Sequence, residues 1–311
     1  MSKFVTIFGG SSFVGRYIVW HLCQKGYNVC VLTRNVQRAS FLKTFGFPGQ
    51  ISLIQGDITD YSLLISIIKS SNIIVNAINT SLSEIDKNNV KSSIGDLISD
   101  YATKYNVDRL IHISSMNSAH EALQNISEKY SEISTILKIG FAFAVDSKYI
   151  HSICQIADFP AIILPKSVQY GLFYCVAASD VAEIVTECIK NDATKGKAYN
   201  IYSGKSYTML AFIKTCLKAL DKNPKIILIP NFIANLIAKV AAILPSSFLK
   251  NICLILNNTN KIPYFTDSNE KTYFKIFHKK PKILEEEISN IIYGNKKDGL
   301  YNSDIKINNY Y

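Results

Sequence analysis

The sequence predicts an α/β protein with a doubly wound parallel sheet, followed by a smaller C-terminal α+β lobe. Short apolar runs alternate with helical patterns from Phe4 to Ile113. A glycine-rich turn joins the first apolar run to the first helical pattern. The chain has 311 residues, of which 48% are hydrophobic, so it can bury a core larger than one typical domain needs. We therefore expect right-handed crossovers and helices on both faces of the sheet.

The expected elements of the sheet follow one another as strand, helix, strand, helix. Each strand is a short apolar run, which is typical of parallel strands buried on both faces. Each helix has apolar residues three and four positions apart. The strands are Phe4–Phe8, Asn28–Leu32, Ile51–Ile54, Ile73–Ala77 and Arg109–Ile113, and the helices between them are Phe13–Lys25, Val36–Phe45, Tyr61–Ser70 and Val90–Tyr105.

The alternation loosens in the second half of the chain. Two more strands are expected at Ile133–Ile139 and Ala161–Leu164, followed by helix Ser179–Asn191, strand Ala198–Ile201, helix Met209–Leu220 and strand Lys225–Ile229. We place a domain boundary near Lys166, to within about ten residues. The predicted parts are a domain of residues 1–165, a lobe of residues 166–293 and a polar tail of residues 294–311 that we expect to be poorly ordered.

Charge and the cysteine and histidine patterns indicate which kinds of partner and metal site to expect. The net charge is +10, but the 30 lysines (34 basic residues less four arginines) are spread along the chain instead of clustered, so no nucleic-acid partner is predicted. An anionic membrane surface or an acidic partner suits this charge better. The seven cysteines form no C-x-x-C pair and the five histidines lack ligand spacing, so we expect a reducing compartment and no metal. Without a signal peptide, the expected location is the cytoplasm.

The first turn resembles a dinucleotide-binding fingerprint with one substitution. A pattern of glycines at three-residue spacing would occupy positions 9, 12 and 15, and the chain has Gly9, Ser12 and Gly15. Gly9 allows the tight turn, and Gly15 allows close packing of helix on strand. The Ser12 side chain either pushes the phosphates outward or gives them a hydroxyl hydrogen bond. In both cases the phosphates would lie at the N-terminus of the first helix.

The end of the second strand favours a phosphorylated ribose. No carboxylate lies between Leu32 and Ser40, whereas Arg34 and Arg38 can meet a 2′-phosphate, which favours NADP(H) over NAD(H). These arginines, four apart, would share a face on the opening turn of a helix, unless both are simply solvated. Asn79 would also lie near the cofactor. The complete predicted cofactor site is Gly9, Gly10, Ser11, Ser12, Phe13, Val14, Gly15, Arg34, Arg38, Asp57, Ile58, Asn76, Ala77 and Ser114.

Asp57 has two interpretations that are compatible. It follows the third strand, where its side chain could reach the adenine edge. Together with Asp60, it also suits turn and N-cap chemistry.

The stretches FGGSSFVGRYIV, LTR, QGDITD, VNAIN and HISS together resemble the atypical and extended short-chain dehydrogenase/reductase superfamily. Within it, the chain is most similar to the NADPH-binding accessory subunit of respiratory complex I and its bacterial relatives. The resemblance continues through YCVAASDVAEIV and GKAYNIYSG to about Gly294. It implies a Rossmann-type fold and a nicotinamide cofactor.

Active members of that superfamily have a serine after the fifth strand and a Tyr-x-x-x-Lys pair on the next helix. There the tyrosine is the general acid/base, and the lysine lowers its pKa. Ser115 matches the serine better than Ser114 does. Tyr130 is followed by Ser134 at the lysine position, and only Tyr293 with Lys297 has the required spacing.

The sequence therefore favours a catalytically silent protein that binds NADP(H) and acts as an accessory or assembly subunit of complex I. One alternative is an active reductase or epimerase whose proton donor is Tyr130, Lys138 or His120. The other is a module that senses NADP(H).

The segment Asn231–Leu256 is strongly apolar. Its first half has polar residues only at 231, 235 and 239, and Pro245 interrupts it, so neither half reaches the roughly 20 residues of a membrane span. The segment either covers the core of the lobe or docks on a hydrophobic partner or a bilayer, with Lys239 and Lys250 directed to water. Docking would place the protein on the cytoplasmic face of the inner membrane.

Overall fold

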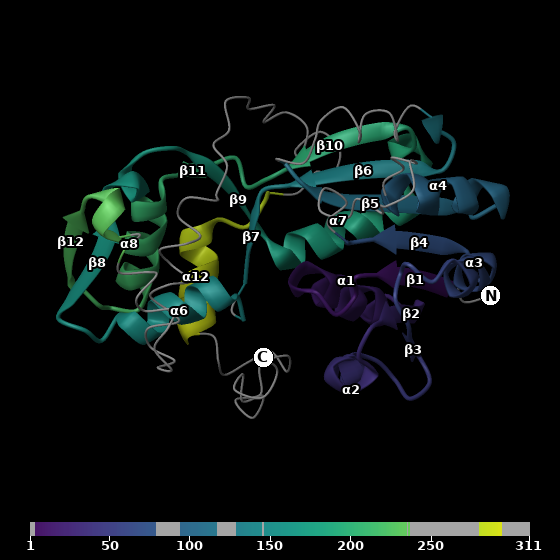
Figure 1. Cartoon of the computed structure of the whole chain (residues 1–311), viewed down its shortest axis with the longest axis horizontal. Helices are drawn as coiled ribbons and strands as arrows, with labels where there is room; N and C mark the ends of the chain where they lie inside the picture. Colours follow the sequence, from purple (N-terminus) through teal and green to yellow (C-terminus); the bar gives the residue numbers. More distant parts are fainter. Residues whose placement is uncertain are drawn as a thin grey trace. The chain divides into compact units, whose positions relative to one another are not determined.

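The computed structural model describes residues 4–78, 94–116, 129–144, 146–234, 236 and 280–293 (Figure 1). These residues form two compact units. The first unit contains the described chain up to Gly140 and then residues 178–201, and the second contains residues 141–177 and the described chain from Tyr202 onward. Within the described residues, the chain changes units after Gly140, after Ala177 and after Ile201. The sequence analysis placed its domain boundary near Lys166.

A seven-stranded sheet forms the centre of the first unit, in the order β10-β6-β5-β4-β1-β2-β3. Every neighbouring pair is parallel. The order reverses direction between β1 and β4, as in a doubly wound sheet, which confirms the predicted Rossmann-type fold. The strands are β1 (Phe4–Phe8), β2 (Asn28–Thr33), β3 (Ile51–Gln55), β4 (Ile73–Asn76), β5 (Arg109–Ser115), β6 (Ser134–Ile139) and β10 (Lys197–Ile201).

Alternate strand residues point to opposite faces of the sheet, and because both faces are apolar, helices cover them. On one face, Phe8, Ile74 and Leu110 pack with apolar residues of α3 (Tyr61–Lys69) and α4 (Ile94–Lys104). Another pair of helices, α1 (Phe13–Gln24) and α7 (Ala178–Lys190), contact each other. The single helix expected over Val36–Phe45 is instead one α-turn, α2 (Val36–Ala39), followed by a 3-10 turn (Ser40–Phe45).

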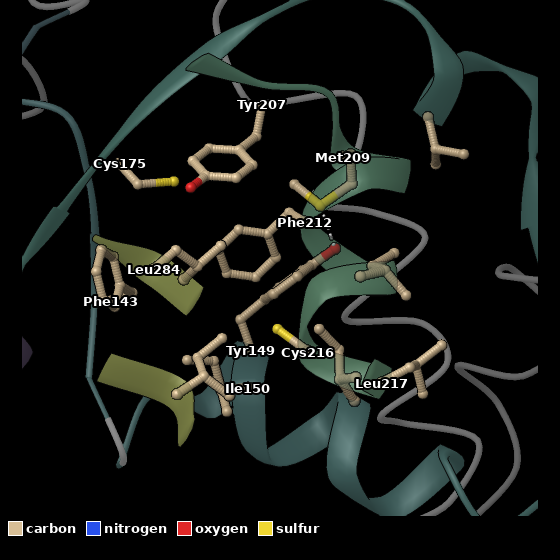
Figure 2. Close-up of a cluster of buried hydrophobic side chains, with 14 of the residues drawn as sticks. Phe143, Tyr149, Ile150, Cys175, Tyr207, Met209, Phe212, Cys216, Leu217 and Leu284 are labelled. Carbon is tan, nitrogen blue, oxygen red and sulfur yellow. Dashed lines mark hydrogen bonds between the residues drawn. The ribbon is translucent and has the colours of Figure 1, made fainter. Parts of the chain in front are cut away.

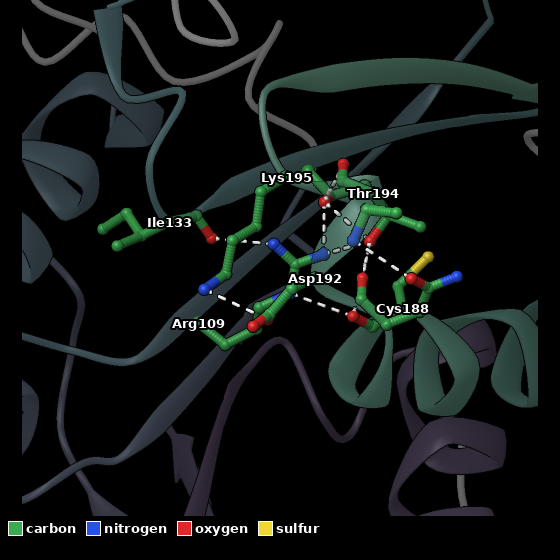
Figure 3. Close-up of polar contacts among 9 residues, drawn as sticks. Arg109, Ile133, Cys188, Asp192, Thr194 and Lys195 are labelled. Carbon is green, nitrogen blue, oxygen red and sulfur yellow. Dashed lines mark hydrogen bonds and ion pairs between the residues drawn. The ribbon is translucent and has the colours of Figure 1, made fainter.

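Arg109, the first residue of β5, ties the sheet to the end of α7 (Figure 3). Its side chain is 2% exposed. Nε donates to the Cys188 carbonyl at 2.9 Å, and one terminal nitrogen donates to the Ile133 carbonyl at 3.1 Å. The other donates to the hydroxyls of Thr135, at 2.6 Å, and Thr194. One buried guanidinium thus joins β5, β6, α7 and the turn after α7.

The second unit contains two small sheets and several helices. The sheets are β11-β9-β7 and the parallel pair β12-β8. Several of these elements were not predicted, because they are short or follow one another without a turn signal. The elements are β7 (Phe141–Phe143), α6 (Lys148–Ile156), β8 (Ala161–Pro165), a 3-10 turn (Lys166–Gln169), β9 (Phe173–Ala177), β11 (Ser206–Tyr207), α8 (Met209–Ala219), β12 (Lys225–Ile229) and α12 (Leu284–Tyr293).

An aromatic cluster forms the core of the second unit (Figure 2). The Phe212 ring lies 5.6 Å from Phe141 and 5.9 Å from Tyr149 between centroids. From α12, Leu284 is fully buried in this cluster. Next to it, the carboxylate of Glu285 accepts a 2.7 Å hydrogen bond from the Tyr207 hydroxyl. The helix near the end of the chain therefore completes a core made of segments about 70 to 140 residues earlier in sequence.

The apolar segment Asn231–Leu256 is described only at its start. Residues 231–234 are helical, and the Asn231 side chain accepts a 3.0 Å hydrogen bond from the Ser167 amide. Phe232 is 73% exposed and Leu236 is 63% exposed. No helix in the described part of the chain is long and apolar enough to cross a membrane. The rest of the segment, with Lys239 and Lys250, and the tail of residues 294–311 lie outside the described residues.

Candidate dinucleotide site

The turn between β1 and α1 has the geometry that small residues permit. Gly9 has φ of +80°, a left-handed conformation that favours glycine, and its carbonyl accepts from the Ser12 amide at 2.9 Å. A Cβ placed on Gly15 would lie 2.1 Å from the Gly9 carbonyl oxygen. A Cβ on Gly10 would lie 2.9 Å from both methyl groups of Val31. The outer glycines are thus required by the turn itself.

Ser12, which departs from the glycine pattern, caps the helix that follows. Its φ of −70° and ψ of 171° are extended and open to any residue, so the backbone does not require glycine there. Its hydroxyl accepts from the Gly15 amide at 3.2 Å. The amides of Phe13 and Val14 belong to the first turn of the helix, where amides have no acceptor within the helix. Ser11 and Ser12 are exposed, so an anion can approach this helix N-terminus.

The two arginines after β2 are both exposed, but they do not share a helical turn as predicted. The side chain of Asn35 accepts from the Arg38 amide at 2.9 Å and caps α2, so the helix begins after Arg34. Arg34 instead acts electrostatically on Asp57, which follows β3. The prediction of a common helical face is therefore wrong for Arg34, because the Asn35 cap lies between the two arginines.

Asp57 makes a local turn and remains accessible. Its carboxylate accepts from the Thr59 amide at 3.0 Å and from the Thr59 hydroxyl at 2.8 Å. These hydrogen bonds, and to a smaller extent the charge of Arg34, lower the pKa of Asp57. Asp60 caps α3 by accepting from the Leu63 amide at 3.1 Å. The neighbouring Ile58 is half-buried. Turn chemistry thus accounts for both carboxylates, and Asp57 is exposed at the carboxyl edge of the sheet.

Two residues predicted for the cofactor site, Asn76 and Ala77, lie at the end of β4 and have different neighbours. A Cβ on Gly9 would lie 3.0 Å from the carbonyl carbon and oxygen of Ala77, so Ala77 lies directly beside the glycine turn. Asn76 is fully buried, and its side chain nitrogen lies 3.2 Å from Nδ1 of His112. Its side chain oxygen accepts from the Ile78 amide at 3.2 Å. The buried side chain of Asn76 therefore contacts His112 and the backbone of Ile78.

Ser114 and Ser115 are the last two residues of β5, so their side chains point to opposite faces of the sheet. Ser114 is buried, and its register partner on β6 is Lys138. Ser115 is partly exposed. Lys138 is 5% exposed, and burial lowers the pKa of its amine. A buried amine thus lies on the strand next to Ser114, near the carboxyl edge where ligands of doubly wound sheets bind.

Tyr130 has a partner on α4. Its hydroxyl donates to Asp100 at 2.6 Å, and the Lys129 ammonium is 3.2 Å from the same carboxylate oxygen. Tyr130 is 5% exposed, and burial together with this hydrogen bond raises the pKa of its hydroxyl. A tyrosine that acts as a general base needs a lowered pKa, so this arrangement opposes that role.

His112 and Ser99 form a buried contact behind Asn76 that the sequence analysis missed, because nothing in one sequence shows that a residue of β5 meets a residue of α4. Nε2 of His112 lies 3.0 Å from the Ser99 hydroxyl of α4. Asn79, His120 and Lys297 lie outside the described residues, as does the side chain of Tyr293. Among the described residues, no group of three histidine, cysteine, aspartate or glutamate side chains could hold a metal ion.

The sequence is similar to proteins of known family. The NmrA-like family model matches residues 1–287. The 40 kDa subunit of mitochondrial NADH-ubiquinone oxidoreductase from Neurospora crassa is 23% identical over 247 residues, which are 76% of this chain and 65% of that subunit. The chain therefore matches less than two thirds of that subunit's length.

A photosystem II assembly factor, Ycf39 of Cyanidium caldarium, is 22% identical over 297 residues, which cover 90% of this chain and 92% of the factor. Among solved structures, the NADPH-dependent quinone oxidoreductase QOR2 of Escherichia coli, complexed with NADPH, superposes with a TM-score of 0.65 at 18% identity. The match covers 93% of this chain and 99% of QOR2.

Proposed function

Because this chain belongs to the NmrA-like family, we propose that its first unit binds NADP(H) at the turn from Gly9 to Gly15. The protein then acts as an accessory or assembly subunit of respiratory complex I and performs no hydride transfer of its own. The observation that carries the proposal is the turn itself, in which Gly9 and Gly15 allow close approach and the N-terminus of α1 faces outward.

Arg34 and Arg38 support NADP(H) over NAD(H). Both are exposed near the carboxyl edge of the sheet, where a 2′-phosphate would lie. The carboxylate nearest in sequence, Asp57, already accepts two hydrogen bonds from Thr59 and interacts with the charge of Arg34. A ribose hydroxyl would have to compete for that carboxylate. When bound, the cofactor would supply a redox-active nicotinamide, while the residues of this chain position its phosphates.

The role in a membrane-bound complex rests on two kinds of relative. The Neurospora crassa protein is a subunit of NADH-ubiquinone oxidoreductase, and Ycf39 is an assembly factor for a different membrane complex. The exposed side chains of Phe232 and Leu236 supply an apolar surface where such a protein could dock, and the net charge of +10 suits an anionic membrane. These two properties support the proposed peripheral attachment to the cytoplasmic face of the inner membrane.

A silent site is supported by the contacts of Tyr130. Its hydroxyl already donates to Asp100, and the position four residues later is Ser134 instead of lysine. A cofactor bound without a proton donor would act as a structural ligand, because binding only to the native state stabilises that state.

Titration with NADPH and NADH tests the cofactor proposal. We expect NADPH to raise the melting temperature more than NADH does, and the double variant Arg34→Ala/Arg38→Ala to remove that difference while leaving the melting temperature of the free protein nearly unchanged. No increase with either dinucleotide would contradict the proposal. Co-purification of the tagged chain with complex I subunits, compared with a Phe232→Ser/Leu236→Ser variant, tests the partner.

An active reductase or epimerase is the second candidate, and the position of Lys138 favours it. This lysine is buried on the strand beside Ser114, and its lowered pKa brings its amine nearer to a useful range for proton transfer. Turnover of carbonyl substrates that disappears in Lys138→Met but persists in Tyr130→Phe would establish this function. It would also overturn the silent role.

A further inference from the structure

A chain of buried polar side chains links the cofactor edge of β4 to α4. Asn76 is 0% exposed, His112 is 1% exposed and Ser99 is 0% exposed. Buried polar groups of this kind weaken a sheet unless each is hydrogen-bonded. Here the distances are 3.2 Å from Asn76 Nδ2 to His112 Nδ1 and 3.0 Å from His112 Nε2 to the Ser99 hydroxyl.

The partners at the two ends decide the direction of every hydrogen bond. The single hydroxyl proton of Ser99 is donated to the Gly95 carbonyl at 2.7 Å, so Ser99 must accept from Nε2–H of His112. Nδ1 of His112 is then unprotonated and accepts from the side chain amide of Asn76. That leaves the Asn76 oxygen to accept from the Ile78 amide at 3.2 Å. All the donors therefore point from the loop after β4 toward the helix.

The end of this chain lies beside the glycine turn. Ala77 and Ile78 are the residues that a Cβ on Gly9 would meet, at 3.0 Å and 3.2 Å. The amide of Ala77 continues the sheet by donating to the Phe8 carbonyl at 2.9 Å. The backbone of residues 77 and 78 is thus held from two directions, by β1 and by the side chain of Asn76.

We infer that His112 is a positioning residue for the dinucleotide site: it fixes the Asn76 amide, which in turn fixes the backbone of Ala77 and Ile78 as the wall opposite the Gly9 turn. The inference rests on the proposed cofactor function. His112 would thus affect cofactor binding through Asn76, without touching the cofactor. A wall displaced by a fraction of an ångström weakens binding because the glycine turn leaves no space to compensate.

Four variants separate positioning from general stability. His112→Leu removes the acceptor for Asn76, whereas His112→Asn keeps an acceptor at the Nδ1 position and loses only the Ser99 end. Ser99→Ala opens the Ser99 end alone. The matched control is Thr6→Val, which breaks another buried side chain pair of the same unit, Thr6 in the middle of β1 with Ser71 just before β4 at 2.6 Å.

We expect His112→Leu to weaken NADPH binding about tenfold, and His112→Asn, Ser99→Ala and Thr6→Val to change it less than about threefold. Affinity is measured by calorimetry at a temperature where every variant is folded. An equal effect of His112→Leu and Thr6→Val on affinity would overturn the inference, since a merely structural role predicts that result.

Two measurements on the protein without ligand decide the hydrogen-bond chain independently. Nitrogen NMR should find His112 protonated on Nε2 and bare on Nδ1, and amide exchange at Ile78 should become faster in His112→Leu but not in Thr6→Val. A proton on Nδ1, or unchanged exchange at Ile78, would refute the arrangement. If these results hold but wild type binds no dinucleotide, the cofactor proposal fails, and the consequence for affinity fails with it.

Discussion

Single buried polar side chains hold the first unit together, and Arg109 makes the most hydrogen bonds of those described above. It donates to Ile133 just before β6, to Thr135 within β6 and to Cys188 near the end of α7. A guanidinium offers five donors in a fixed fork, so neither lysine nor an apolar residue can replace it.

Arg109→Met should lower the free energy of unfolding by roughly 2–4 kcal/mol, because it leaves buried acceptors without a donor. Urea denaturation measures the loss. The control is Lys195→Ala, which removes an ion pair with the largely exposed Asp192 at 3.0 Å and should cost less than about 1 kcal/mol. Equal costs for the two variants would contradict this account of Arg109.

His112 gives stability a defined pH dependence. Burial lowers its pKa to about 4, from an ordinary value near 6.5. Between these two values the unfolded chain binds a proton that the folded chain does not bind. The stabilisation is therefore complete above pH 6.5 and decreases as the pH falls toward 4.

Between pH 7.5 and pH 5, this single group should lower the free energy of unfolding by about 2 kcal/mol. The measurement is urea denaturation of wild type and His112→Asn at both values. The variant does not titrate at this position, so its decrease should be smaller by that amount. The same decrease in both proteins would show that His112 is not buried as a neutral group.

The sequence patterns predicted where residues lie in the fold better than which neighbours their side chains contact. Gly9 was assigned to a tight turn and Gly15 to close packing of helix on strand, and the structure shows both features. Arg34 and Arg38 are exposed, as a role in binding a phosphate requires. Asn76 was predicted beside the cofactor, but its side chain points into the sheet toward a histidine 36 positions away. A side chain's partner across strands depends on register, which one sequence does not reveal.

At the scale of elements, the turn between β1 and α1 shows how closely a helix can approach a strand. Gly15→Ala should weaken NADPH binding at least about tenfold and cost about 1–3 kcal/mol, because the new Cβ would collide with the Gly9 carbonyl oxygen at 2.1 Å. Calorimetric titration checks the affinity.

Gly26→Ala is the comparison for that variant. Gly26 also has positive φ, +81°, but a Cβ there would meet no atom within 4 Å. We expect a cost of about 1 kcal/mol from backbone strain and no change in affinity. Normal NADPH binding by Gly15→Ala would mean that the turn can open without loss.

Most strands and helices of the first unit were predicted to within one or two residues, because glycine or polar residues separate them. One exception is Val36–Phe45, which divides into α2 and a 3-10 turn. The elements that were missed lack such separation. In FYCVAASDVAEIV, β9 runs directly into α7 with no turn residue between them, and its five residues were not predicted as a strand. β11 has only two residues and no periodicity to detect. The bounds of β9 and β11 depend on the strands with which they pair, and no local sequence signal marks them.

For the whole molecule, α12 links the end of the described chain to the core of the second unit. Leu284→Ala should lower the free energy of unfolding by about 2–5 kcal/mol, because Leu284 is fully buried among the aromatic side chains around Phe212. Its effect on NADPH affinity should be small, since the candidate site lies in the other unit. Chemical denaturation and calorimetry measure the two quantities.

Leu236→Ala is the matched control, because the same truncation at a side chain that is 63% exposed should cost less than about 0.5 kcal/mol. If Leu284→Ala cost no more than this control, α12 would not be part of the core. The membership of α12 in this core could not be predicted, because the sequence from Leu236 to Lys280 gives no signal of where the chain returns.

Because the chain enters the second unit before it completes the sheet of the first, the order of translation affects how the first unit folds. β6 ends at Ile139, but its neighbour β10 begins only at Lys197, after residues that belong to the second unit. About 60 residues must be translated before that edge is covered, which takes roughly 3–12 seconds at typical rates. During that time the nascent chain exposes an open strand, and Arg109 still lacks Cys188 and Thr194 as acceptors. A trigger-factor-like chaperone that shields this edge during translation should therefore increase the yield of folded protein.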